Sequence, residues 1–438
     1  MSWLNFFDNY TQEIKHSFGR GINANISPDE EVLFNKSYEA FENNNIIDAY
    51  EYFFKSLENF TNNISNENIS TTREDDKLNF IIYQGLAKVT GFVTEKNLYA
   101  EVILCKKSSA KVALKRYILE RNYQLTYTNY CSDDSNLKLK LYLDNITINP
   151  HKIFFPLREI ALNGDYDKEF AKSEFSDIVL DDIKHLKTVD NQELKIKYNY
   201  LHTLVDKVYK KIKTFPSNDN SGMQAFSFLY LLFKIDYLLV PRHKIYQKMS
   251  KKIINYFNDE NGTIEFKNEE LKEYIDSLIS MSFEQFSENF YNAKYTFSQT
   301  EKTSHEDINI FITESLKKIR WYKNNRYTQV IPMIYKYIAL YILYNYGLHP
   351  VTKGLLHTLV EIQNRDFFEQ LDYQTLYNEK TEVFSKRAII SRIENIIEPY
   401  QDKFKLLEPF GNELNYTSLN EFSNSFYQQI MNLNFEEI

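Results

Sequence analysis

Two histidines and two carboxylates in the C-terminal third of the sequence are of residue types that bind metal ions. His357 and Glu361 are four residues apart on an expected helix, so their side chains share one face of it. Zinc or iron would need further ligands from His349 or Asp366. A di-iron bundle needs Glu-x-x-His pairs from facing helices, and the sequence has no matching set. We therefore expect His357 to be a core or interface histidine hydrogen-bonded to Glu361, with no metal and no cofactor.

Other signatures of catalysis are missing from the sequence. It has no G-x-x-x-x-G-K-[ST], no G-x-G-x-x-G, no H-E-x-x-H and no G-x-S-x-G. Cys105 and Cys131 fall on expected strands without a nearby histidine motif, so inert thiols are the preferred interpretation. We expect no catalytic residue, and an enzyme with its site near His357 and Glu361 is the alternative hypothesis.

One locally basic part of the sequence could dock an acidic partner, RNA or an anionic membrane surface. This lysine zone consists of Lys207, Lys210, Lys211, Lys213, Arg242, His243, Lys244, Lys248, Lys251 and Lys252. Because its lysines lie opposite apolar positions of expected helices, a solvated helix face is the preferred interpretation. Residues 223–240 and 331–348 approach transmembrane length, but charged and tyrosine side chains interrupt both. We expect no membrane contact, and a peripheral membrane scaffold is a further alternative.

Length, composition and charge limit the class of protein. A chain of 438 residues with 43% hydrophobic and 26% charged residues predicts two or three soluble domains. The net charge of −8 argues against a dedicated nucleic-acid binder, so we expect a protein partner and no nucleic acid. Two cysteines cannot form a disulfide framework, and the N-terminus shows no secretory signal. These features predict a cytoplasmic protein, and a homodimer is compatible with them.

The N-terminal part, residues 1–62, is expected to be helical. Ser27 is a suitable N-cap for a helix from Pro28 to Glu42, with proline at the first helical position. Apolar residues recur at helical spacing from Ile46, which predicts a second, antiparallel helix. This hairpin resembles one tetratricopeptide unit, although no second copy follows at a fixed period. Residues 62–76 are polar and lack apolar periodicity, so they are expected to be a loop.

Residues 77–175 show strand patterns of period two. Strands are expected over 80–93, in which Gly85 and Gly91 could be bends, and over 98–104, 123–131 and 137–143. One helix is expected over 108–121, and a short one begins at Pro156 and ends at Asn163 and Gly164. The order β-β-α-β-β-α predicts a four-stranded antiparallel sheet. Its helices should cover the face that carries Leu98, Val102, Leu139 and Leu141.

Residues 190–438 are expected to form a large all-α domain, because apolar residues recur there at helical spacing almost without interruption. The sequence thus predicts a mostly α, α+β multidomain protein. Its parts are an N-terminal helical hairpin, a small β-β-α-β-β-α module with an antiparallel sheet, and a C-terminal all-α domain.

Three segments of the module resemble a known group. Residues 86–94, 123–127 and 154–163 are similar to the sheet and closing helix of the type III secretion chaperone-like fold, which includes the Tir-chaperone and YbjN-type proteins. The resemblance implies a small α+β sandwich that binds an extended client segment, often as a dimer, and performs no chemistry. The chain departs from this group in its N-terminal hairpin and in its long helical part.

A non-enzymatic adaptor or chaperone-like protein is therefore the preferred function. A client segment would add to a free sheet edge and contact the sheet face opposite the helices. The candidate client-binding residues on that face are Tyr99, Ile103, Tyr127 and Tyr142.

Overall fold

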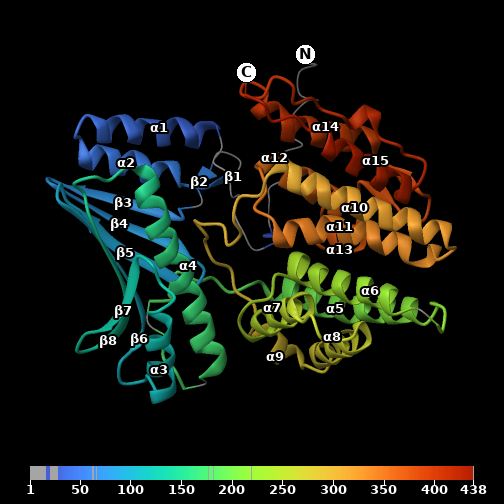
Figure 1. Cartoon of the computed structure of the whole chain (residues 1–438), viewed down its shortest axis with the longest axis horizontal. Helices are drawn as coiled ribbons and strands as arrows, with labels where there is room; N and C mark the ends of the chain where they lie inside the picture. The colour runs from blue at the N-terminus through green and yellow to red at the C-terminus, as the bar shows by residue number, and fades with distance from the viewer. Residues whose placement is uncertain are drawn as a thin grey trace, which may run out of the picture.

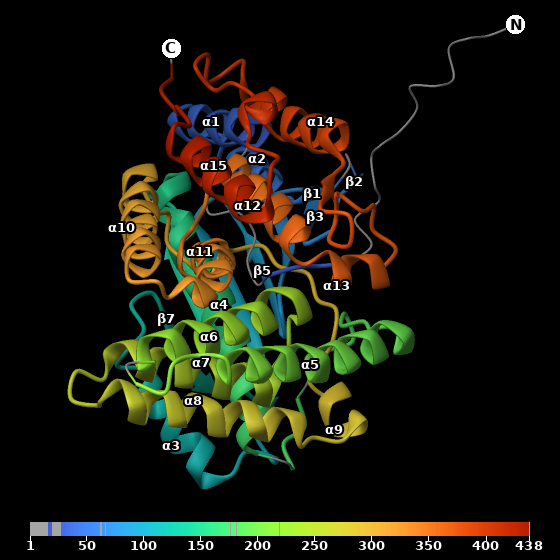
Figure 2. The ribbon, with the colours of Figure 1, turned by 90° about the vertical axis from the view of Figure 1, so that its right-hand side faces the viewer.

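The computed structural model has two parts, one built around a sheet and one made of helices (Figure 1). It describes residues 16–19, 28–61, 64–65, 67–175, 177–180, 182–218 and 220–437. The predicted fold class, a mostly α, α+β protein, is confirmed. The helix α4 lies between the sheet and the helical part, so the opposite face of the sheet points away from that part (Figures 1 and 2).

The N-terminal hairpin consists of α1 (Pro28–Glu42) and α2 (Ile46–Ser56), as the sequence predicts. The expected cap Ser27 lies outside the described residues. Phe53 and Phe54 of α2 are fully buried, and the ring of Phe54 lies 4.6 Å from that of Phe80 in the sheet. The hairpin and the sheet therefore share one hydrophobic core, and the boundary predicted near residue 62 does not divide the packing.

The expected loop over 62–76 is wrong in part, because strand β3 (Ile69–Glu74) lies there. Two short strands, β1 (Phe60–Thr61) and β2 (Ile64–Ser65), precede it. β3 pairs with β4 (Lys77–Gln84) at the edge of the sheet, and only Ile69 of its six side chains is buried. An edge strand that exposes most of its side chains needs no apolar alternation, so the sequence pattern did not reveal it.

The sheet has six antiparallel strands in the order β3-β4-β5-β6-β8-β7, so the prediction of four strands is wrong. The remaining strands are β5 (Ala87–Val93), β6 (Asn97–Lys106), β7 (Thr128–Ser132) and β8 (Asn136–Asp144). The segment expected as one strand over 80–93 is the hairpin of β4 and β5. Gly85 makes its turn with a φ of 56°, and a Cβ there would lie 2.1 Å from an oxygen of Asp165.

The long helix α4 (Pro150–Glu174) covers the leucine face of the sheet. Leu98, Val102, Leu139 and Leu141 are all buried, as predicted. The expected short helix is wrong: Pro156 lies inside α4, and the helix continues through Asn163 and Gly164. A Cβ at Gly164 would come within 3.1 Å of Val102, so glycine here permits close packing rather than ending the helix. The smaller helix α3 (Val112–Arg121) contacts β7 at the edge of the sheet.

The part of the chain after residue 190 is mostly helical and has its own core, but a short sheet of β9 (Tyr377–Asn378) and β10 (Val383–Phe384) departs from the expected all-α domain. Its central helices are α6 (Ser221–Lys234), which continues as the π-helix η1 (Ile235–Leu239), and α11 (Ile331–Asn345). Among the described residues, no helix is both long and apolar enough to cross a membrane. The other longer helices are α5 (Asn191–Ile212), α7 (His243–Asn258), α8 (Ile264–Ile279), α10 (His305–Asn324), α12 (Pro350–Gln363), α14 (Lys386–Ile397) and α15 (Leu419–Met431). Shorter helices complete it: α9 (Phe283–Ser287), η2 (Thr328–Val330), α13 (Arg365–Gln370), η3 (Glu398–Tyr400) and η4 (Gly411–Glu413).

An extended segment of the helical part, residues 292–300, docks on the sheet part, and we call it the strap. The side chain of Gln84 binds its backbone: Oε1 accepts from the amides of Thr296 (3.0 Å) and Phe297 (2.8 Å), and Nε2 donates to the carbonyl of Phe297 (3.1 Å). The Phe297 side chain is 2% exposed and lies in the core of the sheet part. The sheet part therefore completes its packing with residues from the second half of the chain.

Candidate functional site

The strand alternation places aromatic side chains on the face of the sheet that α4 does not cover. Tyr142 of β8 is directly opposite Tyr99 of β6, which is directly opposite Phe92 of β5. The rings of Phe92 and Tyr99 are 5.6 Å apart, and Tyr142 is 63% exposed. We call Phe92, Tyr99 and Tyr142 the aromatic row. Ile103 lies on the same face, opposite Lys138 of β8.

Charged side chains surround the aromatic row. Glu101 accepts a hydrogen bond from the hydroxyl of Tyr99 (2.6 Å) and pairs with Lys138 (3.0 Å). The ammonium groups of Lys77 and Lys140 lie 4.4 Å and 5.8 Å from the centres of the Phe92 and Tyr99 rings. Burial, followed by the hydrogen bond to Glu101, raises the pKa of Tyr99 above its usual range. Tyr99 therefore stays a neutral phenol, suited to contact and hydrogen bonding rather than to accepting protons in a reaction.

Tyr127 is the candidate residue that the sequence placed least well. It was expected inside a strand, but it precedes β7, and its amide donates to Glu159 of α4 at 2.8 Å. Its side chain is 48% exposed. The antiparallel strands β7 and β8 begin their pairing at Thr128 and Leu141. Tyr127 precedes Thr128 and Tyr142 follows Leu141, so both tyrosines are next to this residue pair. Tyr127 therefore lies at the β7 edge, next to the strand pair that carries Tyr142.

The β7 edge itself is closed to an added strand. The Asn122 side chain accepts from the Tyr130 amide (2.6 Å) and donates to the Tyr130 carbonyl (3.3 Å), while Glu159 accepts from the Thr128 amide (2.9 Å). An incoming strand would need these same backbone groups. The expected addition of a client strand is therefore blocked at β7, and contact through the open face is the remaining mechanism at this end of the sheet.

The far corner of the same face is covered by the segment between α4 and α5. His185 lies 4.9 Å from the ring of Tyr83, and Lys88 pairs with Asp182 at 3.2 Å. Phe92, Tyr99 and Tyr142 belong to rows of the sheet nearer its other end. The part of the face available for contact is therefore the part that carries the aromatic row.

The expected hydrogen bond between His357 and Glu361 is wrong. His357 Nδ1 lies 2.8 Å from the hydroxyl of Tyr237, and its ring contacts Phe18 at 5.2 Å. Burial lowers the pKa of His357 to about 3, so the ring is neutral. Glu361 instead pairs with Arg392 at 2.8 Å. The prediction that His357 is a core histidine fits this environment, but its partner comes from α6–η1 rather than from its own helix.

The other residues that the sequence grouped with this pair do not converge on it. His349 caps α12 by accepting from the amide of Val351, and Asp366 pairs with Lys207 at 2.8 Å. Within the described ranges, no three histidine, cysteine, aspartate or glutamate side chains gather closely enough to hold a metal ion. The lysine zone is also divided, because Arg242 and His243 are buried rather than exposed beside its lysines.

A buried polar cluster at the junction of the two parts was missed by the sequence. Asp165 and Glu169 project from α4 toward Arg242 and His243 at the start of α7. Glu169 accepts from the His243 amide at 3.1 Å and also binds the His243 ring and the hydroxyl of Tyr291. These residues were not grouped because the expected helix ended at Gly164, which left both acids outside it. An acidic pair at positions i and i+4 on an extended α4 is the signal that could have found them.

The electrostatics of this junction cluster are set by burial and by opposite charges. Burial, with the nearby Glu169, raises the pKa of Asp165 to about 7, and the Leu86 amide donates to it at 2.7 Å. Burial also raises the pKa of Glu169, but His243, the hydrogen bond from Tyr291 and the charge of Arg242 together outweigh it, so the net pKa is lowered. The planar group of Arg242 lies 4.7 Å from the ring of Tyr295. The cluster joins the β4–β5 turn, α4, α7 and the segment that leads into the strap.

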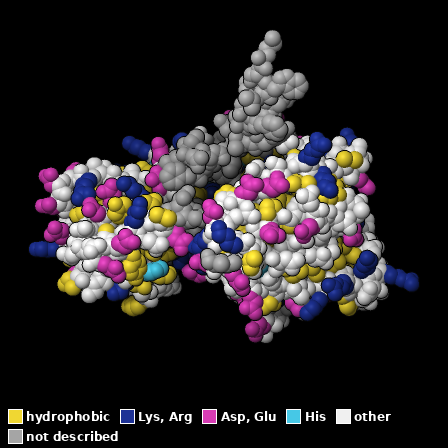
Figure 3. Space-filling view, turned by 90° about the horizontal axis from the view of Figure 1, so that it is seen from above, with side chains coloured by type: hydrophobic (Ala, Val, Ile, Leu, Met, Phe, Trp, Pro, Cys, Tyr) yellow, Lys and Arg dark blue, Asp and Glu magenta, His cyan; other side chains and the backbone are white. Residues whose placement is uncertain are grey.

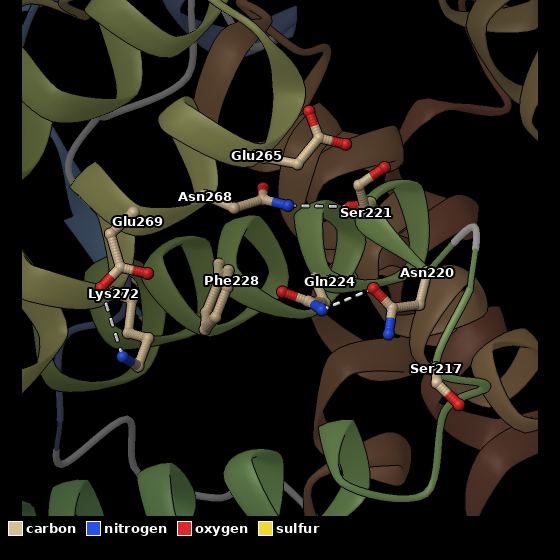
Figure 4. Close-up of a pocket in the computed structure, with 9 residues that line it drawn as sticks. All are labelled: Ser217, Asn220, Ser221, Gln224, Phe228, Glu265, Asn268, Glu269 and Lys272. Atoms are coloured by element: carbon tan, nitrogen blue, oxygen red, sulfur yellow. Dashed lines mark hydrogen bonds and ion pairs between the residues drawn. The ribbon is translucent and has the colours of Figure 1, made fainter.

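A hollow of about 360 Å³ lies elsewhere, between the start of α6 and α8 (Figure 4). Its polar side chains bind one another or the backbone: Asn268 donates to the carbonyl of Ser221 (2.9 Å), and Gln224 to the side chain of Asn220 (2.7 Å). Ser221 is hydrogen-bonded to Glu265, but backbone hydrogen bonding and this contact lower the pKa of Glu265, which makes the carboxylate a weak base for activating the hydroxyl. The hollow therefore offers no chemistry that competes with the aromatic row as the candidate site.

Comparison of the sequence with protein-family models finds no family that matches it. Comparison with curated proteins likewise finds no match.

Proposed function

We propose that this chain is a cytoplasmic, non-enzymatic protein-binding protein, and that its client contacts the aromatic row. One observation carries the proposal: Tyr99 and Tyr142 lie side by side on a sheet face over which no described helix packs, and Tyr142 is 63% exposed. Large aromatic side chains that point into water are effective contact groups, because each can remove roughly 150–250 Å² of surface when buried. The resemblance to secretion chaperone-like modules favours the same role.

The charges beside the aromatic row would give the contact its selectivity. Glu101 and Lys138 present opposite signs within one pair of strands, and Lys140 lies next to them on β8. A client segment that covers Tyr99 and Tyr142 would pair its own polar groups with these side chains. The proposal includes no cofactor, no nucleic acid and no membrane contact, and a second copy of the chain is one possible client.

The test replaces the two tyrosines by Tyr99→Ser and Tyr142→Ser together. Proteins that co-purify from the native host are compared with those of the parent in identity and amount. The control is Phe266→Ser with Trp321→Ser, two aromatic residues on the helical part that are about as exposed as Tyr142 (60% and 56%). Loss of specific partners in the first variant alone supports the proposal.

Partners that are unchanged in the double variant would overturn the proposal. Circular dichroism and the melting temperature show first whether the variant is folded. Because Tyr99 is half-buried and bonded to Glu101, the single change Tyr142→Ser serves as the test if the double variant unfolds.

A further inference from the structure

The helix α3 buries one side and exposes a second apolar stripe on the other. Leu114 and Ile118 face the core and are 1% and 5% exposed. On the opposite side, Val112 and Leu119 are 65% and 63% exposed, and Tyr123, just beyond the helix end, is 94% exposed. Positions 112, 116, 119 and 123 lie within about 60° of one another around a helix, so they form one continuous stripe.

This outer stripe is basic as well as apolar. Lys115 and Arg116 lie along it, both are exposed, and neither makes an ion pair with any residue that the structure describes. Residues 106–124 contain six Lys and Arg and one Glu, a net charge of +5 in a chain whose net charge is −8. Seen from above, by contrast, acidic and basic side chains are interspersed over both parts of the molecule (Figure 3).

A solvated helix normally pairs charges on its outer side and keeps its apolar residues inside. Here three large apolar side chains face water within twelve positions of the chain. Single exposed apolar side chains need no explanation, but a continuous stripe flanked by unpaired cations is typical of a contact surface. A complementary partner must supply apolar side chains along a line and carboxylates beside it.

We infer that the outer stripe of α3 docks an acidic amphipathic helix of a partner protein. The length fits, because ten helical residues present a stripe of roughly 15 Å, which matches apolar anchors at i, i+3 or i+4 and i+7 of a facing helix. The inference rests on the proposal that the chain binds proteins. It does not depend on the aromatic row, which is a separate surface on another face of the sheet.

The distribution of charges around the outer stripe favours a protein partner over a membrane surface or RNA. Asp177 pairs with Lys111 at 2.6 Å, and the carbonyl of Asp133 accepts from Lys107 at 3.1 Å, so acidic residues flank the stripe at one end. A polyanionic surface much wider than the stripe would meet these carboxylates, whereas a single helix about 10 Å across would not. Dedicated nucleic-acid binding also needs a basic footprint larger than one helix.

The experiment uses the full chain and a fluorescent synthetic peptide of about 14 residues, with leucines at helical spacing and glutamates beside them. Fluorescence anisotropy measures its affinity for the parent and for the variant Arg116→Gln with Leu119→Ser. We expect the affinity of the variant to fall about tenfold or more, since it loses an unpaired cation and an apolar anchor. The control Arg320→Gln with Ile310→Ser changes an equally exposed pair on α10 and should bind as the parent does.

Several outcomes would overturn the inference. The first is that the α3 variant and the parent bind the peptide with equal affinity. The second is that a peptide with glutamine in place of glutamate binds the parent equally well. The third is that the parent binds only phosphatidylserine vesicles or single-stranded RNA. If the α3 double variant is not folded by circular dichroism, the single change Arg116→Gln decides. The Tyr99→Ser, Tyr142→Ser variant should bind the peptide normally, so failure of the α3 inference and failure of the proposed function are distinguishable.

Discussion

Removing the charge of Asp165 should change how the stability of the protein depends on pH. Asp165 is 6% exposed, lies beside Glu169, and accepts from the Leu86 amide at 2.7 Å. Burial and the neighbouring carboxylate raise its pKa from 3.8 to about 7. Since the folded state holds the proton more tightly than the unfolded state, the stabilisation is complete below about pH 4 and is lost as pH rises through about 7.

The size of this effect follows from the difference between the two pKa values. A shift from 3.8 to about 7 corresponds to at most roughly 4 kcal/mol, since each unit is worth about 1.4 kcal/mol. Asp165→Asn keeps an oxygen that can accept from Leu86 but never carries a charge. Parent and variant should therefore have similar free energies of unfolding near about pH 4, and the variant should be more stable by up to a few kcal/mol near about pH 8.

The assay is urea unfolding followed by circular dichroism at several pH values across that window. The exposed Asp206, which pairs with Lys210 at 2.7 Å, supplies the control Asp206→Asn. Its difference from the parent should change little between about pH 4 and 8. If the difference for Asp165→Asn is also independent of pH, or if the variant is the less stable one near about pH 8, Asp165 is a charged partner of Arg242 and the reasoning is refuted.

Two further substitutions test the contacts that hold distant segments in place. Gln84→Leu removes the side-chain hydrogen bonds to Thr296 and Phe297, so it should lower the free energy of unfolding by roughly 2–4 kcal/mol. It should also speed proteolytic cleavage near the strap. Unchanged proteolysis would contradict the anchoring role of Gln84. Phe18→Ala removes a half-buried ring that contacts His357, so it should lower the free energy of unfolding by about 2 kcal/mol, measured by urea unfolding. An unchanged urea midpoint would show that residues 16–19 add nothing to the core of the helical part.

Local periodicity allowed the main elements to be predicted, and it failed where packing between distant segments decided the outcome. The alternation in β8 was recognised because its leucines all face one core. Gly85 was expected as a possible bend within one strand, and the full turn between β4 and β5 was not predicted because Leu86, inside the turn, is fully buried and reads as part of a strand. The end of α4 was misplaced because Gly164 serves contact with Val102, which no local pattern encodes.

The candidate site was predictable to the extent that it depends on strand alternation. Tyr99, Ile103 and Tyr142 fall on one face because side chains alternate along β6 and β8. The capping of Tyr130 by Asn122 was not predictable, since it depends on where the α3–β7 loop folds back. The junction cluster was beyond reach for the same reason: Glu169 and His243 are 74 positions apart.

The strap has a consequence for the order in which the protein can fold during synthesis. Gln84 and Phe297 are separated by 213 positions, and Phe297 fills the core that begins with the N-terminal hairpin. A ribosome must therefore produce about two thirds of the chain before the sheet part can close its core, although the six strands are complete by Asp144. Until then, the site for Phe297 stays open on a nascent intermediate, where chaperones or a premature partner could bind. If the sheet part were expressed alone, the site of Phe297 in its core would stay empty.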